Sequence, residues 1–448
     1  MHSSCESAMT TLDWSGLFVG RYSKESLAQT MRFVRAASLS LVMIGLLAFG
    51  TLVCFQAISC PLCEGVGNTI SDDVKSPAVG VIAVCQRCTE IADGQYEIEI
   101  DPKSVVPVGR GPNAPTPQID RLLVFEAIPP KTSVFLIGIP DDCERDQSKV
   151  SEKKLVSWIW TAPSVVSTMG REYLQGLPTE ATSEVQRLVY FYSHLFSTDS
   201  FVNEDAYNEC ARVSLSVMRD PDFQKTVHRE SLLGALRGSA MNPKHKSFLW
   251  MVLAEWGKES DQELFRELVT PILKRELGSV EDERVSVDLA KDHPWMAASI
   301  AAFIKLGKEP ALREIEEFIF ANPKCSMSMK STGINAARVL GNDLRAMETQ
   351  RLARSLAMMI QDSECADLVI PDLARWDYWD AMPELVRLFD RPESARGFVR
   401  TPIMNYLRRC PLPQADQHLK RMRSEDPTAY RRALTNVPVL EKAPVLTP

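Results

Sequence analysis

A run without a single charged side chain, Ala36 to Phe55, constrains this chain more than any other feature. A stretch of about 20 apolar residues can cross a bilayer as a helix. Arg32 and Arg35 precede the run, and such flanking cations favour the cytoplasm for its N-terminal side. A buried core helix explains the run less well, because soluble folds rarely contain so long a stretch without charge. We therefore expect everything after Cys60 to be extracytoplasmic, in the cell envelope or secreted.

The run has two main interpretations. If translation starts at Met31, residues 31–59 have the parts of a cleaved signal peptide, and residues 1–30 are a spurious extension or a disordered tail. Otherwise the run is a retained signal-anchor, a single N-terminal transmembrane helix behind a cytoplasmic tail of about 35 residues. A variant of the cleaved form is a lipoprotein acylated on Cys60, although Ala57 stands where a larger aliphatic residue is expected.

The composition predicts a globular protein with more than one folded unit. The chain has 448 residues, of which 45% are hydrophobic and 24% charged. This length exceeds one typical domain and supplies ample core. The formal net charge is −7. Because a dedicated nucleic-acid-binding protein needs a basic face for phosphate, no nucleic acid is expected as a partner.

Residues 60–140 show the pattern of a small β domain. The stretch QYEIEID (95–101) alternates strictly between apolar and acidic side chains, as in a strand with one buried face. Further strands are expected within 77–84 and, on both sides of the turn IPPK, within 121–139. Five prolines make 102–117 an extended loop. We expect a small sheet or a partly closed, OB-like barrel.

The pattern changes after residue 140. Residues 141–181 begin with a polar stretch and predict a linker with short helices. From 182 to 434, apolar residues such as Val185 and Leu188 recur at helical spacing, and Pro and Gly divide the pattern into roughly a dozen helices. Residues 435–448 are expected to be a flexible tail.

Paired helices at a period near 40 residues predict an α-solenoid. The best unit has a helix ending MPELVRLF, a short acidic turn and a helix beginning FVRTPIMNYL, and it resembles a HEAT repeat. Asp390 and Arg400 match the acidic turn and the Arg of such repeats, and the resemblance implies that Arg400 braces the stack. The predicted fold class is therefore α+β and multidomain, a small β-sheet domain followed by a mostly α-helical HEAT-like solenoid. A globular helical domain is the alternative.

Four cysteines form two C-x-x-C pairs, Cys60 with Cys63 and Cys85 with Cys88. Four thiolates in this pattern can hold zinc tetrahedrally and stabilise a small sheet, so these are the candidate metal ligands and zinc the candidate cofactor. The 21 residues between the pairs slightly exceed the usual spacing. Disulfides or unpaired thiols are favoured over zinc, because the expected compartment is oxidising. Unless a helix starts there, a strain-free bond between Cys60 and Cys63 is not expected, and each could reach Cys85, Cys88 or Cys143.

Catalytic motifs are missing from the sequence, so an enzyme is not expected. H-E-x-x-H, G-x-S-x-G, P-loop and dinucleotide-binding patterns are absent. CPLC has the proline of some thioredoxin-like motifs, but it does not open a long helix in a βαβ unit, which leaves thiol-redox chemistry as a weaker alternative. We expect capping or solvated roles for Glu204, Asp205 and Glu209, and a packing or surface role for His194.

Two further clusters suggest contacts. Trp376, Tyr378 and Trp379 lie close together, and we expect them to wedge consecutive helices rather than to bind a ligand. Between Arg396 and Arg432, basic residues outnumber acidic ones by nine to three. Such an excess suits an acidic partner or a membrane surface, although a solvated helical face explains it more simply.

The exported part resembles an uncharacterised family of secreted planctomycete proteins. The similarity rests on CPLC after the leader and on three later stretches, NEDAYNECA (203–211), ADLVIPDLARWDYW (366–379) and VRTPIMNYLRRCPLPQA (399–415). It spans most of residues 60–434 and implies a small β domain followed by HEAT-like helices, with no activity attached. The β domain also resembles netrin-like modules, whose N-terminal Cys chelates the metal of a target enzyme, although those modules begin C-x-C.

The sequence thus predicts an exported, non-enzymatic protein-interaction scaffold. Its partner is an unknown protein, and it contacts the membrane through the N-terminal apolar segment if that segment is uncleaved. One alternative is a cell-envelope protein stabilised by zinc or active in thiol-redox chemistry. The other is a netrin-like module that binds or inhibits an extracytoplasmic enzyme.

Overall fold

A computed structural model describes residues 60–63, 65–110, 117–141, 158–278, 292–362, 364–395 and 398–435. The predictions for the leader, for the tail after residue 435 and for Cys143 lie outside these residues. In the part of the chain that is described, no helix has both the length and the apolar character needed to cross a membrane.

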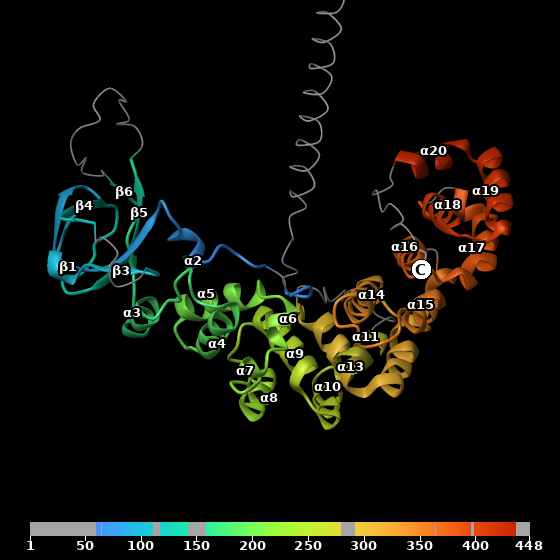
Figure 1. The fold of residues 1–448 in the computed structure, drawn as a ribbon, viewed down its shortest axis with the longest axis horizontal. Coiled ribbons are helices and arrows are strands. Elements are labelled where there is room, and N and C mark those ends of the chain that lie inside the picture. The colour runs from blue at the N-terminus through green and yellow to red at the C-terminus, as the bar shows by residue number, and fades with distance from the viewer. Residues whose placement is uncertain are drawn as a thin grey trace, which may run out of the picture. The chain divides into compact units, whose positions relative to one another are not determined.

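The first part is an antiparallel sheet of seven strands (Figure 1). The strands are β1 (Val79–Ala92), β2 (Gln95–Ile100), β3 (Val106–Val108), β4 (Arg121–Val124), β5 (Ser133–Pro140), β6 (Trp158–Trp160) and β7 (Ser164–Val165). Their order is β4-β2-β1-β5-β6, with β3 also on β1 and β7 also on β5. Because this path has two ends among the described strands, a closed OB-like barrel is not confirmed.

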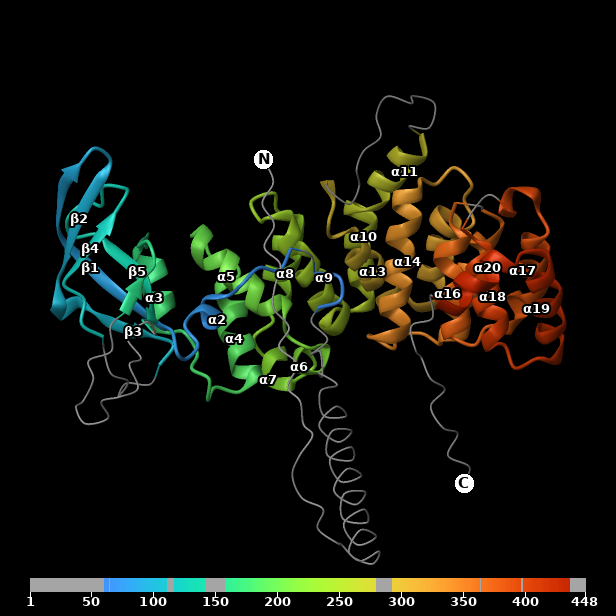
Figure 2. The ribbon, with the colours of Figure 1, turned by 90° about the horizontal axis from the view of Figure 1, so that it is seen from above.

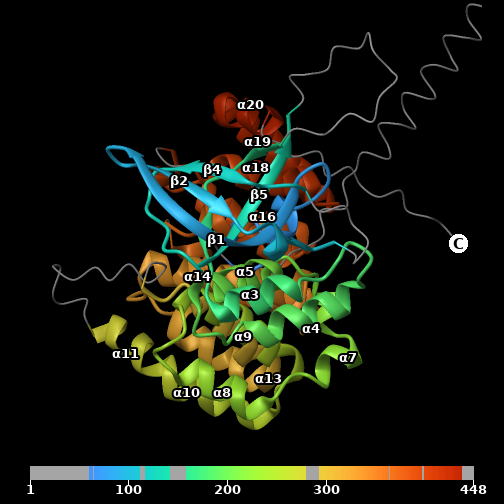
Figure 3. The same cartoon turned by 90° about the vertical axis from the view of Figure 1, so that its left-hand side faces the viewer.

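Strand β1 connects the two halves of the sheet (Figure 3). Its first half pairs with β3 and β5, and its second half pairs with β2. The register shifts between Cys85 and Arg87, so that Cys85 faces Ile100 and Cys88 faces Ile98. Residues three apart normally point to opposite faces of a strand. The irregularity at Gln86 instead turns both cysteines toward the same apolar cluster.

The predicted alternation of the second strand is confirmed. Ile98 and Ile100 are buried in the sheet core. On the opposite face, Arg121 forms ion pairs with Glu97 at 3.3 Å and with Glu99 at 3.5 Å. The strand is therefore half-buried, as its sequence indicates.

The sheet continues beyond residue 140, where the sequence predicted a linker with short helices. Strands β6 and β7 both pair with β5, and β3 lies in the stretch expected to be a loop. These strands have only two or three residues, too few for a periodic signal. The short helix expected in this range is present as α3 (Thr168–Gln175).

The remainder of the described chain is mostly helical, as predicted, after an early short helix, α2 (Ile70–Asp73). The longer helices are α4 (Glu184–His194), α5 (Ser200–Ala211), α8 (Arg229–Arg237), α9 (Pro243–Trp256), α11 (Thr270–Gly278), α13 (Met296–Ile315), α14 (Met327–Asn342), α15 (Thr349–Ala357), α16 (Ala366–Arg375), α18 (Arg400–Arg409), α19 (Pro413–Glu425) and α20 (Pro427–Thr435). The shorter ones are α6 (Leu215–Met218), α7 (Pro221–Gln224), α10 (Gln262–Leu268), α17 (Met382–Phe389) and the single turns η1 (Pro102–Ser104), η3 (Glu259–Asp261), η5 (Glu316–Phe320), η6 (Met358–Gln361), η7 (Trp379–Ala381) and η8 (Pro392–Ala395).

Polar side chains set where several helices begin. Ser183, Asp199 and Ser326 each accept a backbone N–H from the first turn that follows them, at the starts of α4, α5 and α14. A side-chain acceptor at this position satisfies a donor that the helix itself leaves unpaired. Within α13, Lys308 has φ 54° just before Pro310, and the helix kinks there.

Helices that follow one another along the chain pack together (Figure 2). Contacts run from α4 to α5, α9, α13, α14, α16, α18 and α20 in turn. One apolar cluster extends through these helices and includes Ile82 and Phe135 from one face of the sheet. A second cluster, built around Cys85 and Ile98, fills the other face of the sheet. The sheet therefore packs on the helices through one face and keeps its own core on the other.

Candidate functional site

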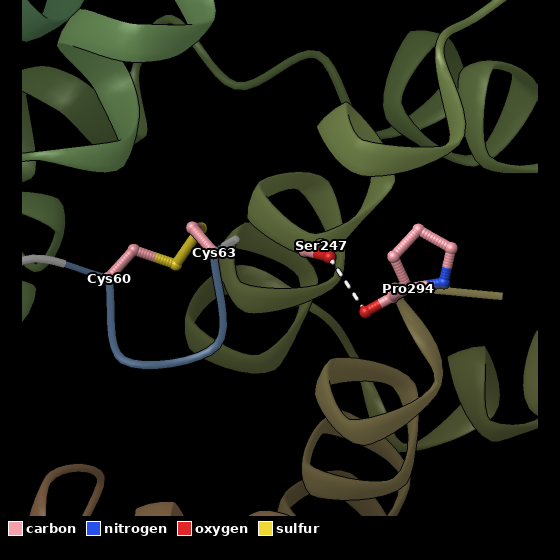
Figure 4. The surroundings of a disulfide bond; sticks show 4 residues. All are labelled: Cys60, Cys63, Ser247 and Pro294. Atoms are coloured by element: carbon pink, nitrogen blue, oxygen red, sulfur yellow. Dashed lines mark hydrogen bonds between the residues drawn. A yellow bond between two sulfur atoms is a disulfide. The ribbon is translucent and has the colours of Figure 1, made fainter. Parts of the chain in front are cut away.

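The first C-x-x-C pair is a disulfide between Cys60 and Cys63, whose Cα atoms lie 5.4 Å apart (Figure 4). The expectation that these two cysteines do not bond to each other is wrong. The chain turns at Pro61 and Leu62, and the backbone N–H of Cys63 donates to the carbonyl of Cys60 at 3.2 Å. This turn brings the two Cα atoms within the range that a disulfide bridges.

The second pair is open. Cys85 is buried on β1, with its Sγ 3.7 Å from the carbonyl oxygen of Ile128, and Cys88 is half-buried. Burial raises the pKa of the Cys85 thiol, and the neighbouring Cys88 raises it further. Both thiols are free. The second pair therefore has the same spacing as the first pair but no disulfide.

The described structure does not bring the four predicted zinc ligands together. Cys60 belongs to the helical core, whereas Cys85 belongs to the separate core of the sheet. The sulfurs of Cys60 and Cys63 bond to each other, and a metal site requires free thiolates. Across residues 60–435, apart from the stretches left undescribed, no group of three or more His, Cys, Asp or Glu side chains is placed to hold a metal ion.

The most elaborate polar arrangement lies where the N-terminal segment, residues 60–74, runs along α5. The backbone N–H of Cys60 donates to the carbonyl of Ala211 at 2.9 Å. Farther on, the N–H of Gly67 donates to Oδ1 of Asn208 at 3.0 Å. The third hydrogen bond between the segment and α5 comes from Ile70, whose N–H donates to Oδ1 of Asp205 at 2.7 Å. The segment thus docks on α5 through its backbone.

Asp205 lies at the centre of this docking. It is 6% exposed, and the hydroxyl of Tyr173 donates to its second oxygen at 2.5 Å. Burial raises the pKa of Asp205 to about 6, although the hydrogen bonds from Tyr173 and Ile70 act in the opposite direction. The expectation of a capping or solvated role for Asp205 is therefore wrong, because the residue lies inside α5 and accepts from a segment far away in sequence.

Two arginines complete the arrangement. Arg212 forms an ion pair with Asp72 and donates to the carbonyl of Gly67 at 2.7 Å. Against the effect of burial, hydrogen bonds from Lys75 and Arg212 lower the pKa of Asp72 to about 2. The second arginine is Arg187 on α4.

Arg187 donates to Oε2 of Glu209 and to the hydroxyl of Ser71, both at 3.0 Å. Glu209 is 8% exposed, so the solvated role expected for it is also wrong. We call the six side chains that hold the segment the N-terminal clasp. They come from α3, α4, α5 and the residue that follows α5: Tyr173, Arg187, Asp205, Asn208, Glu209 and Arg212.

The nearby histidines have packing roles. His194 packs among aromatic rings, edge-on to Tyr173 and tilted against Tyr190, with ring centroids 5.0 Å and 4.5 Å away. His245 is fully buried against Tyr207, and its Nε2 lies 3.2 Å from a carboxylate oxygen of Glu204. Burial lowers the pKa of His245. The clasp and the histidines beside it therefore hold parts of the chain together through fixed hydrogen bonds and ring packing.

The aromatic cluster wedges helices, as expected. Trp376 is 6% exposed and donates through Nε1 to Oδ1 of Asn342 on α14 at 2.9 Å. Trp379 packs edge-on against Tyr406 of α18, with ring centroids 5.1 Å apart. The hydroxyl of Tyr406 donates to the carbonyl of Tyr378 at 2.7 Å. The cluster thus joins α14, the turn after α16, and α18.

A cavity of about 570 Å³ lies between η5, η6 and the first turns of α14 and α16. Cys325 and Cys365 line it, and burial raises the pKa of both thiols to about 12. Beside them, Lys330 is 5% exposed and forms an ion pair with Asp362 at 2.5 Å. Sequence reasoning missed this cavity. The available signal was CSMSMK (325–330), where sulfur recurs at every second residue.

Comparison with known proteins finds no matching family model, no matching curated protein and no matching solved structure.

Proposed function

We propose that this protein is an exported, non-enzymatic scaffold whose helices form a HEAT-like solenoid and bind another protein along their surface. The observation that carries the proposal is a recurring set of ion pairs that join successive helices. Solenoids present extended surfaces and act mainly as binding platforms.

Four of these ion pairs join residues that are a similar number of positions apart. Arg229 bonds to Asp261, Lys330 to Asp362 and Arg338 to Asp372, which are separations of 32, 32 and 34 residues. Arg351 adds a bond to Glu316 at a separation of 35. Ion pairs between residues about one repeat length apart are expected where neighbouring helical layers stack on one another. Other pairs span more residues, such as Arg266 with Glu314 at a separation of 48. These links between neighbouring helical layers support a solenoid.

The unit that resembles a HEAT repeat has the contacts that the resemblance implies. The guanidinium of Arg400 lies 4.4 Å from the ring centroid of Phe389, at the end of α17. It also donates to the carbonyl of Phe389 at 3.3 Å and to Asp426, before α20, at 3.2 Å. Arg400 thus connects two layers. Asp390 does not pair with it and bonds instead to Arg421 of α19 at 2.7 Å.

Export is supported by the disulfide. Disulfides persist in oxidising compartments and are rare in the cytosol. The Cys60–Cys63 bond comes directly after the run that predicts a leader. We therefore also propose that the protein is located in the cell envelope or secreted, and that it is related to the secreted planctomycete proteins that it resembles.

The netrin-like alternative is less well supported. An inhibitor of that kind presents its first Cys to the metal of a target enzyme. Cys60 is 3% exposed, and its backbone N–H already donates to the carbonyl of Ala211. Zinc through the four cysteines would require opening the Cys60–Cys63 bond. We therefore keep the scaffold as the single proposed function.

Site-specific photo-crosslinking in the source organism tests the scaffold. The probe is placed at Arg409 or Lys420, both exposed on helices α18 and α19, or at the exposed Leu123 on β4 as the matched control. We expect one protein to crosslink from the helical positions and not from the sheet. In a chain without the probe, the double change Arg409→Glu with Lys420→Glu should lower affinity recovery of that partner protein by about tenfold, because a reversed rim charge slows association. A partner that crosslinks only from Leu123, or the absence of any discrete crosslink, contradicts the proposal.

A further inference from the structure

The geometry points to a copper site, in which the cavity between η5, α14, η6 and α16 binds Cu(I) through Cys325, Cys365 and Met327. This inference is independent of the scaffold proposal, because it concerns side chains inside the helical layers rather than their outer surface. It rests on the kind of atoms that line the cavity, on their arrangement and on the cation beside them.

Sulfur is concentrated in this cavity. Five of the thirteen residues that line it carry sulfur: Cys325, Met327, Met358, Met359 and Cys365. In the whole chain, with 11 Cys and 17 Met among 448 residues, only about one residue in sixteen does so. Thiolate and thioether are soft ligands, which select Cu(I) over hard ions such as Mg²⁺ or Ca²⁺.

The sulfurs are arranged from the surface inward. Met327 and Met358 are 37% and 41% exposed, whereas Cys325 and Cys365 are 7% and 0% exposed. The Sγ of Cys365 lies 3.2 Å from the Sδ of Met327. One ion bound between these two atoms requires only a small separation of the pair. The thioethers therefore offer an entry to the buried thiols.

One buried cation lies beside the two thiols. When Cu(I) binds, each coordinating thiol forms a Cu–S bond and releases its proton to solvent, and no electron is transferred. Two thiolates with one Cu⁺ carry a net charge of −1. The buried ammonium of Lys330 lies beside both cysteines and offsets part of this charge, although it also forms an ion pair with Asp362 at 2.5 Å. Asp362 and Glu364 are the carboxylates that line the cavity.

Methionine-rich surfaces also bind apolar helices of other proteins. The metal is favoured here because the two cysteines lie beneath the methionines, where a docking helix would not reach them. A chain that retains no copper in the titration would overturn the proposal.

The test is an anaerobic titration of the full chain with Cu(I), supplied as its acetonitrile complex, in competition with bicinchoninate and without added reductant. We expect one Cu(I) per chain, with a sulfur-only shell at about 2.3 Å in X-ray absorption, close to the length of other metal–thiolate bonds. Cys365→Ser should weaken binding by about 100-fold or more, and Met327→Leu by about tenfold.

Matched controls separate this site from the other sulfurs. Cys410→Ser changes a buried cysteine at the end of α18, and Met169→Leu changes an exposed methionine on α3. Both should leave the affinity within about twofold of the unchanged chain. If Cys365→Ser fails to fold, the exposed Met327→Leu and Met358→Leu variants provide the comparison with Met169→Leu.

The two C-x-x-C pairs are the main competitors for copper. We expect the double variants Cys60→Ser/Cys63→Ser and Cys85→Ser/Cys88→Ser to keep the single Cu(I). The inference is wrong if either double variant loses the ion while Cys365→Ser retains it. It also fails if mass analysis of the native chain finds a Cys325–Cys365 disulfide, because the sulfurs would then be committed to each other.

Discussion

The two C-x-x-C pairs have the same spacing and opposite structures. Cys60 and Cys63 lie in a turn, are joined as a disulfide and pack on the helices. Cys85 and Cys88 lie on β1, remain free and face the core of the sheet. The spacing is therefore not what determines the chemistry of either pair.

Backbone geometry accounts for the difference. Three residues of extended strand span about 10 Å, which exceeds the limit of about 7 Å between Cα atoms that a disulfide bridges. A turn shortens the same interval, and the Cα atoms of Cys60 and Cys63 lie 5.4 Å apart. The first pair also belongs to a segment that the N-terminal clasp holds in place, whereas the second depends on the pairing of β1 with β2.

Removal of the central clasp carboxylate should have the largest effect. Asp205→Ala leaves the hydroxyl of Tyr173 and the N–H of Ile70 without their acceptor in a buried place. We expect a loss of about 3 kcal/mol or more in the free energy of unfolding, measured by urea denaturation. The control Glu97→Ala breaks an exposed ion pair on the sheet and should cost less than about 1 kcal/mol. Equal losses in the two variants would contradict the role of the clasp.

Alkylation should separate the four cysteines. In the native chain without reductant, iodoacetamide should modify Cys88 first, because its side chain is half-buried and its thiol free. Cys85 should react about 100-fold more slowly, since burial hides it and raises its pKa. Cys60 and Cys63 should react only after reduction. Peptide mass spectrometry follows the rates, and rapid labelling of Cys60 would show that the disulfide is not formed.

The clasp should also depend on pH. Burial raises the pKa of Asp205 from its ordinary value of 3.8 to about 6. The folded chain thus holds this proton to higher pH than the unfolded chain, and the stability gained below about pH 4 is lost as the pH rises through about 6. The measured quantity is the free energy of unfolding of the unchanged chain minus that of the Asp205→Asn variant. This difference should fall by about 2–3 kcal/mol between pH 4 and pH 7. A difference that stays flat, or rises with pH, would rule out the buried acid.

Loss of the disulfide should have the smallest effect. Because it closes a very short loop, Cys60→Ser with Cys63→Ser should lower the free energy of unfolding by only about 1–2 kcal/mol. Cys88→Ser, at a half-buried position without a bond, should change it by less than about 0.5 kcal/mol. Chemical denaturation of both variants beside the unchanged chain measures the difference. A larger loss for Cys88→Ser would reverse the comparison.

Local patterns were predictable where periodicity was strong. The alternation of Gln95–Ile100 identified a half-buried strand, and apolar spacing identified the helices from α4 onward. Strands β6 and β7 were not predictable, because elements of two or three residues have no period and depend on pairing with β5. The open sheet likewise follows from pairings that are distant in sequence.

The clasp was harder to predict than the fold. Asp205, Asn208 and Glu209 share one helical face, a spacing that equally fits a solvated surface. Their burial depends on the N-terminal segment, which contacts them across 135 to 141 residues. The signal that was available is an acidic and amide stripe on a helix that also carries Tyr207 and Cys210. Sequence spacing alone does not reveal which distant segment covers it.

The docking of residues 60–74 also sets an order for events during synthesis. This segment emerges early, whereas its acceptors on Asp205 and Asn208 follow 135 and 141 residues later. At a ribosome that adds about 5–20 residues each second, the segment waits about 7 to 30 seconds for its partners. The disulfide needs only a partner three residues away and can form during this interval. A bond formed in this interval would shape the turn before α5 arrives.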